Sequence, residues 1–182
     1  MVYIALANGF EEIEALTVID VIRRAGIDIS SFSITSDKEV MGAHGITVIA
    51  DCTLPKADLA KSEFVILPGG MPGAANLRNC AKLCQELTKR ANNRQNIAAI
   101  CAAPFILGEL GILKNKRATC YPGFENKLEG CIYTGAMVEQ DDNIITGKGP
   151  AAAMDFALKI VETMADKKTS DDIATGMLCK LL

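Results

Sequence analysis

The stretch AAICAAPFILG, residues 98–108, decides the fold because it describes a buried strand that turns directly into a helix. Apolar residues fill the strand NIAAIC (96–101). Pro104 follows near the first turn of the helix, where its missing backbone N–H does no harm. The single Cys101 at this turn is therefore either a nucleophile or a small residue packed among other small residues.

Short apolar runs alternate with helical patterns along the rest of the chain. The patterns predict strands at 2–7, 27–35, 63–67, 96–101, 117–120, 131–139 and 143–147, with a small hairpin over 38–54. They predict helices at 11–25, 74–92, 102–113, 150–164 and 170–180. This alternation favours an α/β sandwich with a mostly parallel sheet, built as one domain over residues 1–182.

Composition excludes several classes of function. A formal charge of −3, no tryptophan and 5% aromatic residues argue against a nucleic-acid surface or a polybasic membrane patch. No apolar run reaches the ~18 residues that span a bilayer, and the N-terminus lacks the cationic start of a signal peptide. We therefore expect a cytoplasmic protein whose seven cysteines are mostly free thiols. We expect no metal site, because Cys80 and Cys84 lack a second close pair and the chain has one histidine.

Open α/β sheets place their sites at the carboxyl ends of strands, and three such ends stand out, at 7–11, 67–70 and 100–103. A nucleophile on a tight strand-to-helix turn needs small neighbours two residues before and after it, which Ala99 and Ala103 supply. The amide of Ala102 would lie beside the sulfur at a helix start, a position that lowers a thiol pKa. The turn therefore allows a nucleophile elbow at Cys101, but any small cysteine packed at a strand end fits the same Ala-x-Cys-x-Ala pattern.

The other two strand ends carry glycines and acids. Gly69 and Gly70 offer backbone amides to an oxyanion, or form a plain tight turn. Glu11, Glu12 and Glu14 crowd a helix start, where carboxylates favour the helix dipole. One of them, buried and protonated, could instead hydrogen-bond a thiolate, and the residues alone do not choose which.

His44 is the only imidazole and lies in a glycine-flanked turn. It is either the base of a Cys–His couple or a solvated loop residue, and its distance from Cys101 in sequence favours the second interpretation.

Four segments together give the chain a resemblance to a known family. They are GFEEIEALTVIDVIRRAGI (9–27), ILPGG (66–70), NIAAICAAP (96–104) and TGKGPAAAMDFALKIVE (146–162). In this order they resemble the DJ-1/ThiJ/PfpI superfamily, in the branch of the Parkinson-disease-associated protein and its bacterial relatives. The resemblance implies a flavodoxin-like three-layer sandwich and a homodimer.

The resemblance also assigns roles to individual residues. It implies that Cys101 is a low-pKa elbow nucleophile that oxidises to sulfinate, and that Glu14 is the protonated glutamate beside the sulfur. It places five residues in the wall of the pocket: Gly69, Gly70, Ala102, Gly149 and Pro150. It places Arg24 and His44 near the dimer interface.

Four departures from related patterns narrow the function. Tyr121, in ATCYPGFENK (118–127), stands where some members have a histidine beside the cysteine, and His44 stands where an arginine is usual at the interface. Ala102 replaces the histidine that follows the cysteine in PfpI-type proteases, which disfavours proteolysis. The C-terminal region lacks the histidine of glutamine amidotransferases, which disfavours amidotransfer.

The sequence therefore favours a cofactor-independent glyoxalase or deglycase. The Cys101 thiolate would attack glyoxal- or methylglyoxal-type carbonyls, free or attached to protein and nucleotide groups, and Glu14 would shuttle protons. Two alternatives stay open: a redox sensor or holdase chaperone acting through oxidation of Cys101, and a role in thiazole monophosphate biosynthesis that the family's older name suggests.

Overall fold

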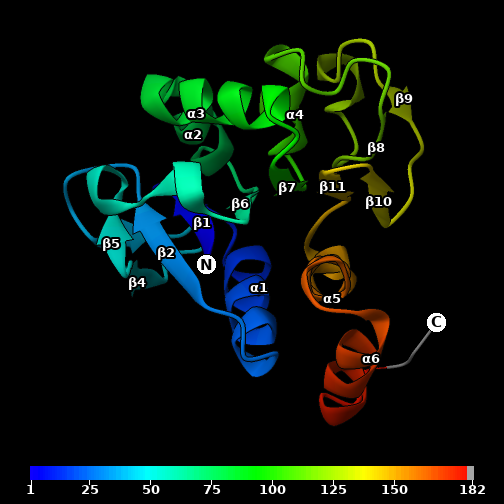
Figure 1. Ribbon diagram of the computed structural model, residues 1–182. Coiled ribbons are helices and arrows are strands. Elements are labelled where there is room, and N and C mark those ends of the chain that lie inside the picture. The colour runs from blue at the N-terminus through cyan, green and yellow to red at the C-terminus, as the bar shows by residue number, and fades with distance from the viewer. Residues whose placement is uncertain (180–182) are drawn as a thin grey trace.

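A central sheet of seven strands organises the computed structural model, which describes residues 1–179 (Figure 1). Its strands are β1 (Val2–Leu6), β2 (Ile29–Ser33), β5 (Cys52–Thr53), β6 (Phe64–Leu67), β7 (Asn96–Ile100), β10 (Val138–Asp141) and β11 (Ile144–Gly147). They lie in the order β10-β11-β7-β6-β1-β2-β5, and all neighbours are parallel except β10 and β11. The mostly parallel sheet is as predicted.

Helices cover both faces of this sheet. Figure 1 shows α1 (Glu12–Arg24), α5 (Ala153–Met164) and α6 (Lys167–Gly176) on one side, and α2 (Gly73–Asn79), α3 (Ala81–Asn92) and α4 (Pro104–Glu109) on the other. The three layers confirm the predicted α/β sandwich, which is flavodoxin-like. Among the residues that the structure describes, no helix combines the length and the apolar character needed to cross a membrane.

The alternation of side chains along the central strands explains the two cores. On β6 and β7, Val65 and Ile97 contribute to the cluster that includes α2, α3 and α4, whereas Phe64 and Ile66 contribute to the cluster that includes α1 and α5. All four side chains are fully buried. Because both faces of a parallel sheet are covered, its strands read as continuous apolar runs in the sequence.

Two predicted elements differ from the structure in the first half of the chain. The single helix expected over 74–92 is two helices, broken at Cys80, whose ψ of 93° is extended. Within 38–54, β3 (Glu39–Met41) and β4 (Thr47–Ile49) form the expected antiparallel hairpin, but β5 leaves it and pairs with β2. No glycine or proline marks either change, so the sequence gives no local signal for them.

The later elements are shorter or shifted. The strand expected over 131–139 is β9 (Ile132–Tyr133), which pairs with β8 (Arg117–Ala118) in a separate small sheet, followed by β10. Helix α4 ends at Glu109, and the helix expected at 150–164 starts with a turn of 3-10 helix at 150–152. The helix expected over 170–180 starts at Lys167, where Asp166 caps it, and ends at Gly176; residue 180 lies outside the described residues.

The strand order brings three loops to one edge of the sheet. The chain runs outward from β1 to β2 and β5, and then returns to the other side of β1 at β6, β7 and β11. The carboxyl ends of β1 and β6 therefore form a topological switch point, where open α/β sheets hold their ligands. The three strand ends that the sequence singled out meet there, with the Cys101 turn directly after β7.

Candidate active site

Cys101 lies at the turn between β7 and α4 in a left-handed backbone conformation, with φ at +63°. This conformation costs a residue with a Cβ roughly 1–2 kcal/mol and persists only where the surroundings hold it. Two backbone hydrogen bonds do so: the Cys101 N–H donates to Gly147 O (2.9 Å), and the Tyr121 N–H donates to Cys101 O (2.8 Å). The turn has the elbow geometry that the sequence predicts.

Glu14 reaches the same point from the first turn of α1. Its side chain is fully buried, and Oε2 accepts the Gly69 N–H at 2.7 Å. Oε1 has no partner of standard hydrogen-bond geometry among the described residues. Burial raises the pKa of this carboxyl to about 7, against the opposing effects of the Cys101 thiol and the Gly69 amide. A carboxyl in this state can hold or release a proton near neutral pH.

Gly69 separates these two groups. A Cβ built at Gly69 would lie 2.6 Å from Cys101 Cβ and 2.8 Å from Glu14 Oε2, so no other residue fits without displacing one of them. The resemblance grouped Gly69 with Gly70 as pocket glycines, but in the structure their N–H groups have different partners. The Gly69 N–H is used by Glu14, whereas the Gly70 N–H, like that of Ala102, is directed at the Cys101 sulfur.

The pKa of Cys101 departs from the low value that the sequence led us to expect. Burial, and then the negative charge of Glu14 and its hydrogen bond, raise the pKa of the thiol to about 12, although the amides of Gly70 and Ala102 act in the opposite direction. A thiol facing an ionised carboxylate in a buried site resists losing its proton. The prediction of a low-pKa thiol was therefore wrong for the state in which Glu14 is ionised.

The two groups form one coupled acid. With a single proton between them, the site holds either a thiol and a carboxylate or a thiolate and a carboxylic acid. In the second arrangement the carboxylic acid donates to the sulfur, and the amides of Gly70 and Ala102 stabilise its charge. Glu14 is thus the only described acid placed to decide the protonation of Cys101.

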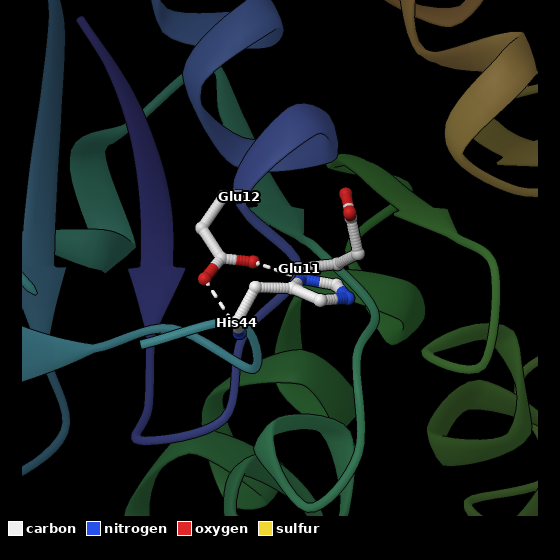
Figure 2. A group of neighbouring side chains, drawn as sticks. All are labelled: Glu11, Glu12 and His44. Carbon is white, nitrogen blue, oxygen red and sulfur yellow. Dashed lines mark hydrogen bonds and ion pairs between the residues drawn. The ribbon is translucent and has the colours of Figure 1, made fainter. Parts of the chain in front are cut away.

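The other two acids of the helix start have different partners. Glu11 is the N-cap of α1, and its Oε2 accepts the Glu14 N–H at 2.8 Å. Glu12 accepts hydrogen bonds from the backbone N–H of His44 and from its ring Nδ1, both at 2.7 Å (Figure 2). Burial opposes ionisation of Glu12, but the bonds from His44 outweigh it and lower the carboxyl pKa. Glu12 thus holds the β3–β4 turn against α1, whereas Glu11 caps the helix.

His44 is therefore engaged outside the Cys101 site. Its side chain is 70% exposed, and its hydrogen bond to Glu12 raises the pKa of the imidazole. The ligand atoms of Glu11, Glu12 and His44 lie within 4.8 Å of one another, as in a metal site, but both Glu12 oxygens are already used by His44 (Figure 2). The spacing of residues 12 and 44 gave no signal of this pair.

The remaining predicted residues fall in two places. Gly149 and Pro150 start the turn before α5, and a Cβ at Gly149 would lie 3.1 Å from Tyr121 Cδ2, so this segment borders the elbow through the tyrosine ring. Arg24 pairs with Asp20 at 2.7 Å on the exposed surface of α1, away from the sulfur. Its place at a dimer interface stays a prediction.

Comparison with known proteins agrees with this fold. The DJ-1/PfpI family profile matches residues 1–163, so the chain belongs to the DJ-1/PfpI family. The crystal structure of a DJ-1 superfamily protein from Salmonella typhimurium is similar, with a TM-score of 0.94 and 31% identity, over 99% of this chain and 98% of that one.

Two curated relatives differ in their extent. Protein DJ-1 homolog B of Arabidopsis thaliana is 37% identical over 98% of this chain, but the chain spans only 41% of that protein. The glutathione-independent glyoxalase DJR-1.2 of Caenorhabditis elegans is 33% identical over 90% of this chain and 87% of that protein.

The raised pKa of Glu14 predicts a pH-dependent stability. Since its pKa is about 7 in the folded chain and 4.5 ordinarily, the folded protein keeps a proton that the unfolded chain loses between these values. The free energy of unfolding should fall by on the order of 3 kcal/mol as the pH rises from about 4.5 to about 7. In Glu14→Gln this fall should be absent, as measured by urea unfolding at each pH.

The exposed Glu129→Gln serves as the matched control and should keep the dependence of the wild type. Parallel curves for the wild type and Glu14→Gln would show that Glu14 is not the titrating group.

Proposed function

We propose that this protein is a cofactor-independent glyoxalase or deglycase that uses Cys101 as its nucleophile and Glu14 as its acid–base group. Its substrates are reactive dicarbonyls such as glyoxal and methylglyoxal, free or as adducts on protein and nucleotide groups. The observation that carries the proposal is the contact of the Glu14 carboxyl and the Cys101 turn at Gly69. The likeness to a relative named as a glyoxalase supports the substrate class.

The first step is addition of the thiol to the aldehyde. The sulfur forms a bond to the aldehyde carbon while its proton passes to the Glu14 carboxylate, which returns it to the carbonyl oxygen. The product is a hemithioacetal on Cys101. The N–H groups of Gly70 and Ala102, which point at the sulfur, are the donors nearest to the oxygen as it gains negative charge.

The second step is an internal rearrangement. Glu14 removes the proton from the former aldehyde carbon, and the electron pair moves through an enediol to the neighbouring ketone carbon. Glu14 then delivers a proton to that carbon, leaving a thioester of a 2-hydroxy acid. Water hydrolyses the thioester and releases lactate from methylglyoxal and free Cys101. One carbon is oxidised and its neighbour reduced by the same two electrons, so the reaction needs no external electron acceptor.

A pKa near 7 suits Glu14 to this double role. A general acid–base group is most effective when its pKa lies close to the working pH, because both of its forms are then available. Without a histidine in the described surroundings of the sulfur, Glu14 alone has to move every proton.

A second candidate function is redox sensing through oxidation of Cys101. The amides of Gly70 and Ala102, directed at the sulfur, would also donate to the oxygens of a sulfinate. This function involves no turnover, so the detection of a product separates it from the enzymatic proposal.

Exposed apolar side chains support the proposal of a homodimer. Ile13 and Leu16 on α1, and Met41, Ile46 and Ile49 on the β3–β4 hairpin, are 39–73% exposed. The hairpin is tied to the start of α1 through His44 and Glu12, so both sets lie in the same region. Large apolar side chains gathered at a surface favour contact with another protein surface, here a second copy of this chain.

Purified wild-type protein should convert methylglyoxal to lactate, measured by enzymatic lactate detection. Cys101→Ser should lower kcat by at least about 10³-fold, because the nucleophile is lost. Cys52→Ser, which changes a partly buried cysteine elsewhere, should keep the wild-type rate. No lactate from reduced wild type, or lactate at an unchanged rate from Cys101→Ser, would contradict the enzymatic proposal.

The wild type should sediment as a dimer at micromolar concentration, and Ile49→Lys should raise its dissociation constant by at least about 100-fold. A two-fold axis uses each residue twice, and each buried isoleucine contributes roughly 1.5–3 kcal/mol. Ile132→Lys, which changes an isoleucine of similar exposure on β9, should leave the dimer intact. A monomeric wild type would refute the dimer.

A further inference from the structure

A small hollow lies beside the elbow, apart from the residues that act on protons. Three segments line it: Tyr121 and Pro122 after β8, Met137 before β10, and residues 148–152 between β11 and α5. Its volume is about 220 Å³. Tyr121 and Met137 are 46% and 45% exposed, so the hollow is open to solvent on one side.

Backbone hydrogen bonds fix two walls of this hollow to the nucleophile. The Tyr121 N–H donates to Cys101 O at 2.8 Å, which places the first residue of one wall against the elbow itself. The Cys101 N–H donates to Gly147 O at 2.9 Å, and the second wall begins at the next residue, Lys148. The third wall follows, because the Lys148 N–H donates to Met137 O at 2.9 Å. The hollow therefore borders the turn that carries Cys101.

The surface of the hollow is almost wholly apolar. Prolines, alanines, the methionine and the tyrosine ring provide most of it. Its one charged residue, Lys148, donates from Nζ to Gly135 O at 3.1 Å, so its ammonium group is held by a backbone carbonyl and its aliphatic stem faces the hollow wall. None of the residues lining the hollow carries a carboxylate, and this composition suits an uncharged apolar group rather than an acid or a sugar.

The volume of the hollow favours an occupant larger than a methyl group. An apolar cavity of about 150 Å³ holds a benzene molecule, whereas a water molecule, close in size to a methyl group, takes about 30 Å³. A hollow of about 220 Å³ is therefore larger than an aromatic ring requires and far larger than the substituent of methylglyoxal. Glyoxal carries only a hydrogen atom in place of that substituent, so the hollow would stay filled with water.

We propose that this hollow is a substituent pocket, in which Tyr121 and Met137 bind an aryl or branched alkyl group attached to the carbonyl that Cys101 attacks. This inference rests on the proposed function and narrows its substrate class to α-oxoaldehydes with a bulky apolar substituent, such as phenylglyoxal. Tyr121 acts as a specificity residue: its backbone holds the elbow and its ring lies over Gly149.

The test measures recognition without turnover. For each protein, the rate of Cys101 alkylation by N-phenyl-2-iodoacetamide is divided by the rate with iodoacetamide. The same quotient is measured for free N-acetylcysteine, which has no pocket. Dividing the first quotient by the second gives the corrected ratio, from which the intrinsic reactivity of the two reagents has been removed. An apolar group filling a hydrophobic pocket changes such ratios by roughly 10-fold or more. The corrected ratio for the wild type should therefore exceed about 10.

Variants of the two walls identify the pocket. Tyr121→Ala and, independently, Met137→Gln should each lower the corrected ratio at least about 5-fold, since each removes apolar contact with the phenyl group. Tyr133→Ala is the matched control, because Tyr133 is 39% exposed and does not line the hollow, and it should stay within about twofold of the wild type.

The outcomes separate the two proposals. A corrected ratio near 1 for the wild type, or an equal loss in Tyr133→Ala, would overturn the substituent pocket whether or not lactate is formed. A high ratio that falls in Tyr121→Ala and Met137→Gln would establish the pocket even if methylglyoxal gave no lactate, in which case only the proposed turnover would fail.

Discussion

The carboxyl group of Glu14 and the turn that carries Cys101 meet across the bare backbone of Gly69. This contact depends on three segments that are distant in sequence and adjacent only because β1, β6 and β7 end at one edge of the sheet. The left-handed turn at Cys101 presents the sulfur, α1 presents the acid, and Gly69 contributes an amide and no side chain. Because the carboxyl and the thiol are both buried, keeping one proton between them costs less free energy than leaving a carboxylate and a thiolate side by side.

The three acids at the start of α1 have different roles because each occupies a different position in the first turn. Glu11 caps the helix, Glu12 holds the hairpin through His44, and Glu14, the third residue of α1, is fully buried. The histidine is thereby committed to a structural contact on the surface. The chemistry proposed for Cys101 therefore has one proton-transfer group, Glu14, and two backbone amides, those of Gly70 and Ala102.

Much of this arrangement could be predicted from the sequence, because apolar runs on buried parallel strands and small residues around Cys101 are local signals. The break at Cys80 could not, since neither glycine nor proline marks it. The residues alone did not select Glu14 among its neighbours; the family resemblance did, and its contact with Gly69 supports that choice. The direction of the Cys101 pKa with Glu14 ionised was mispredicted, because it depends on burial and on the charge of a residue 87 positions away, which no local pattern encodes.

The most direct test of the shared proton is the rate of Cys101 alkylation by iodoacetamide as a function of pH. If Glu14 and Cys101 titrate as one acid, the wild-type rate should rise through an inflection near the pKa of about 7, as the pair loses its first proton. The inflection should be absent in Glu14→Gln, whose rate should rise only with ionisation of the thiol itself. Superimposable profiles for the two proteins, or a wild-type profile without an inflection near neutral pH, would contradict the account.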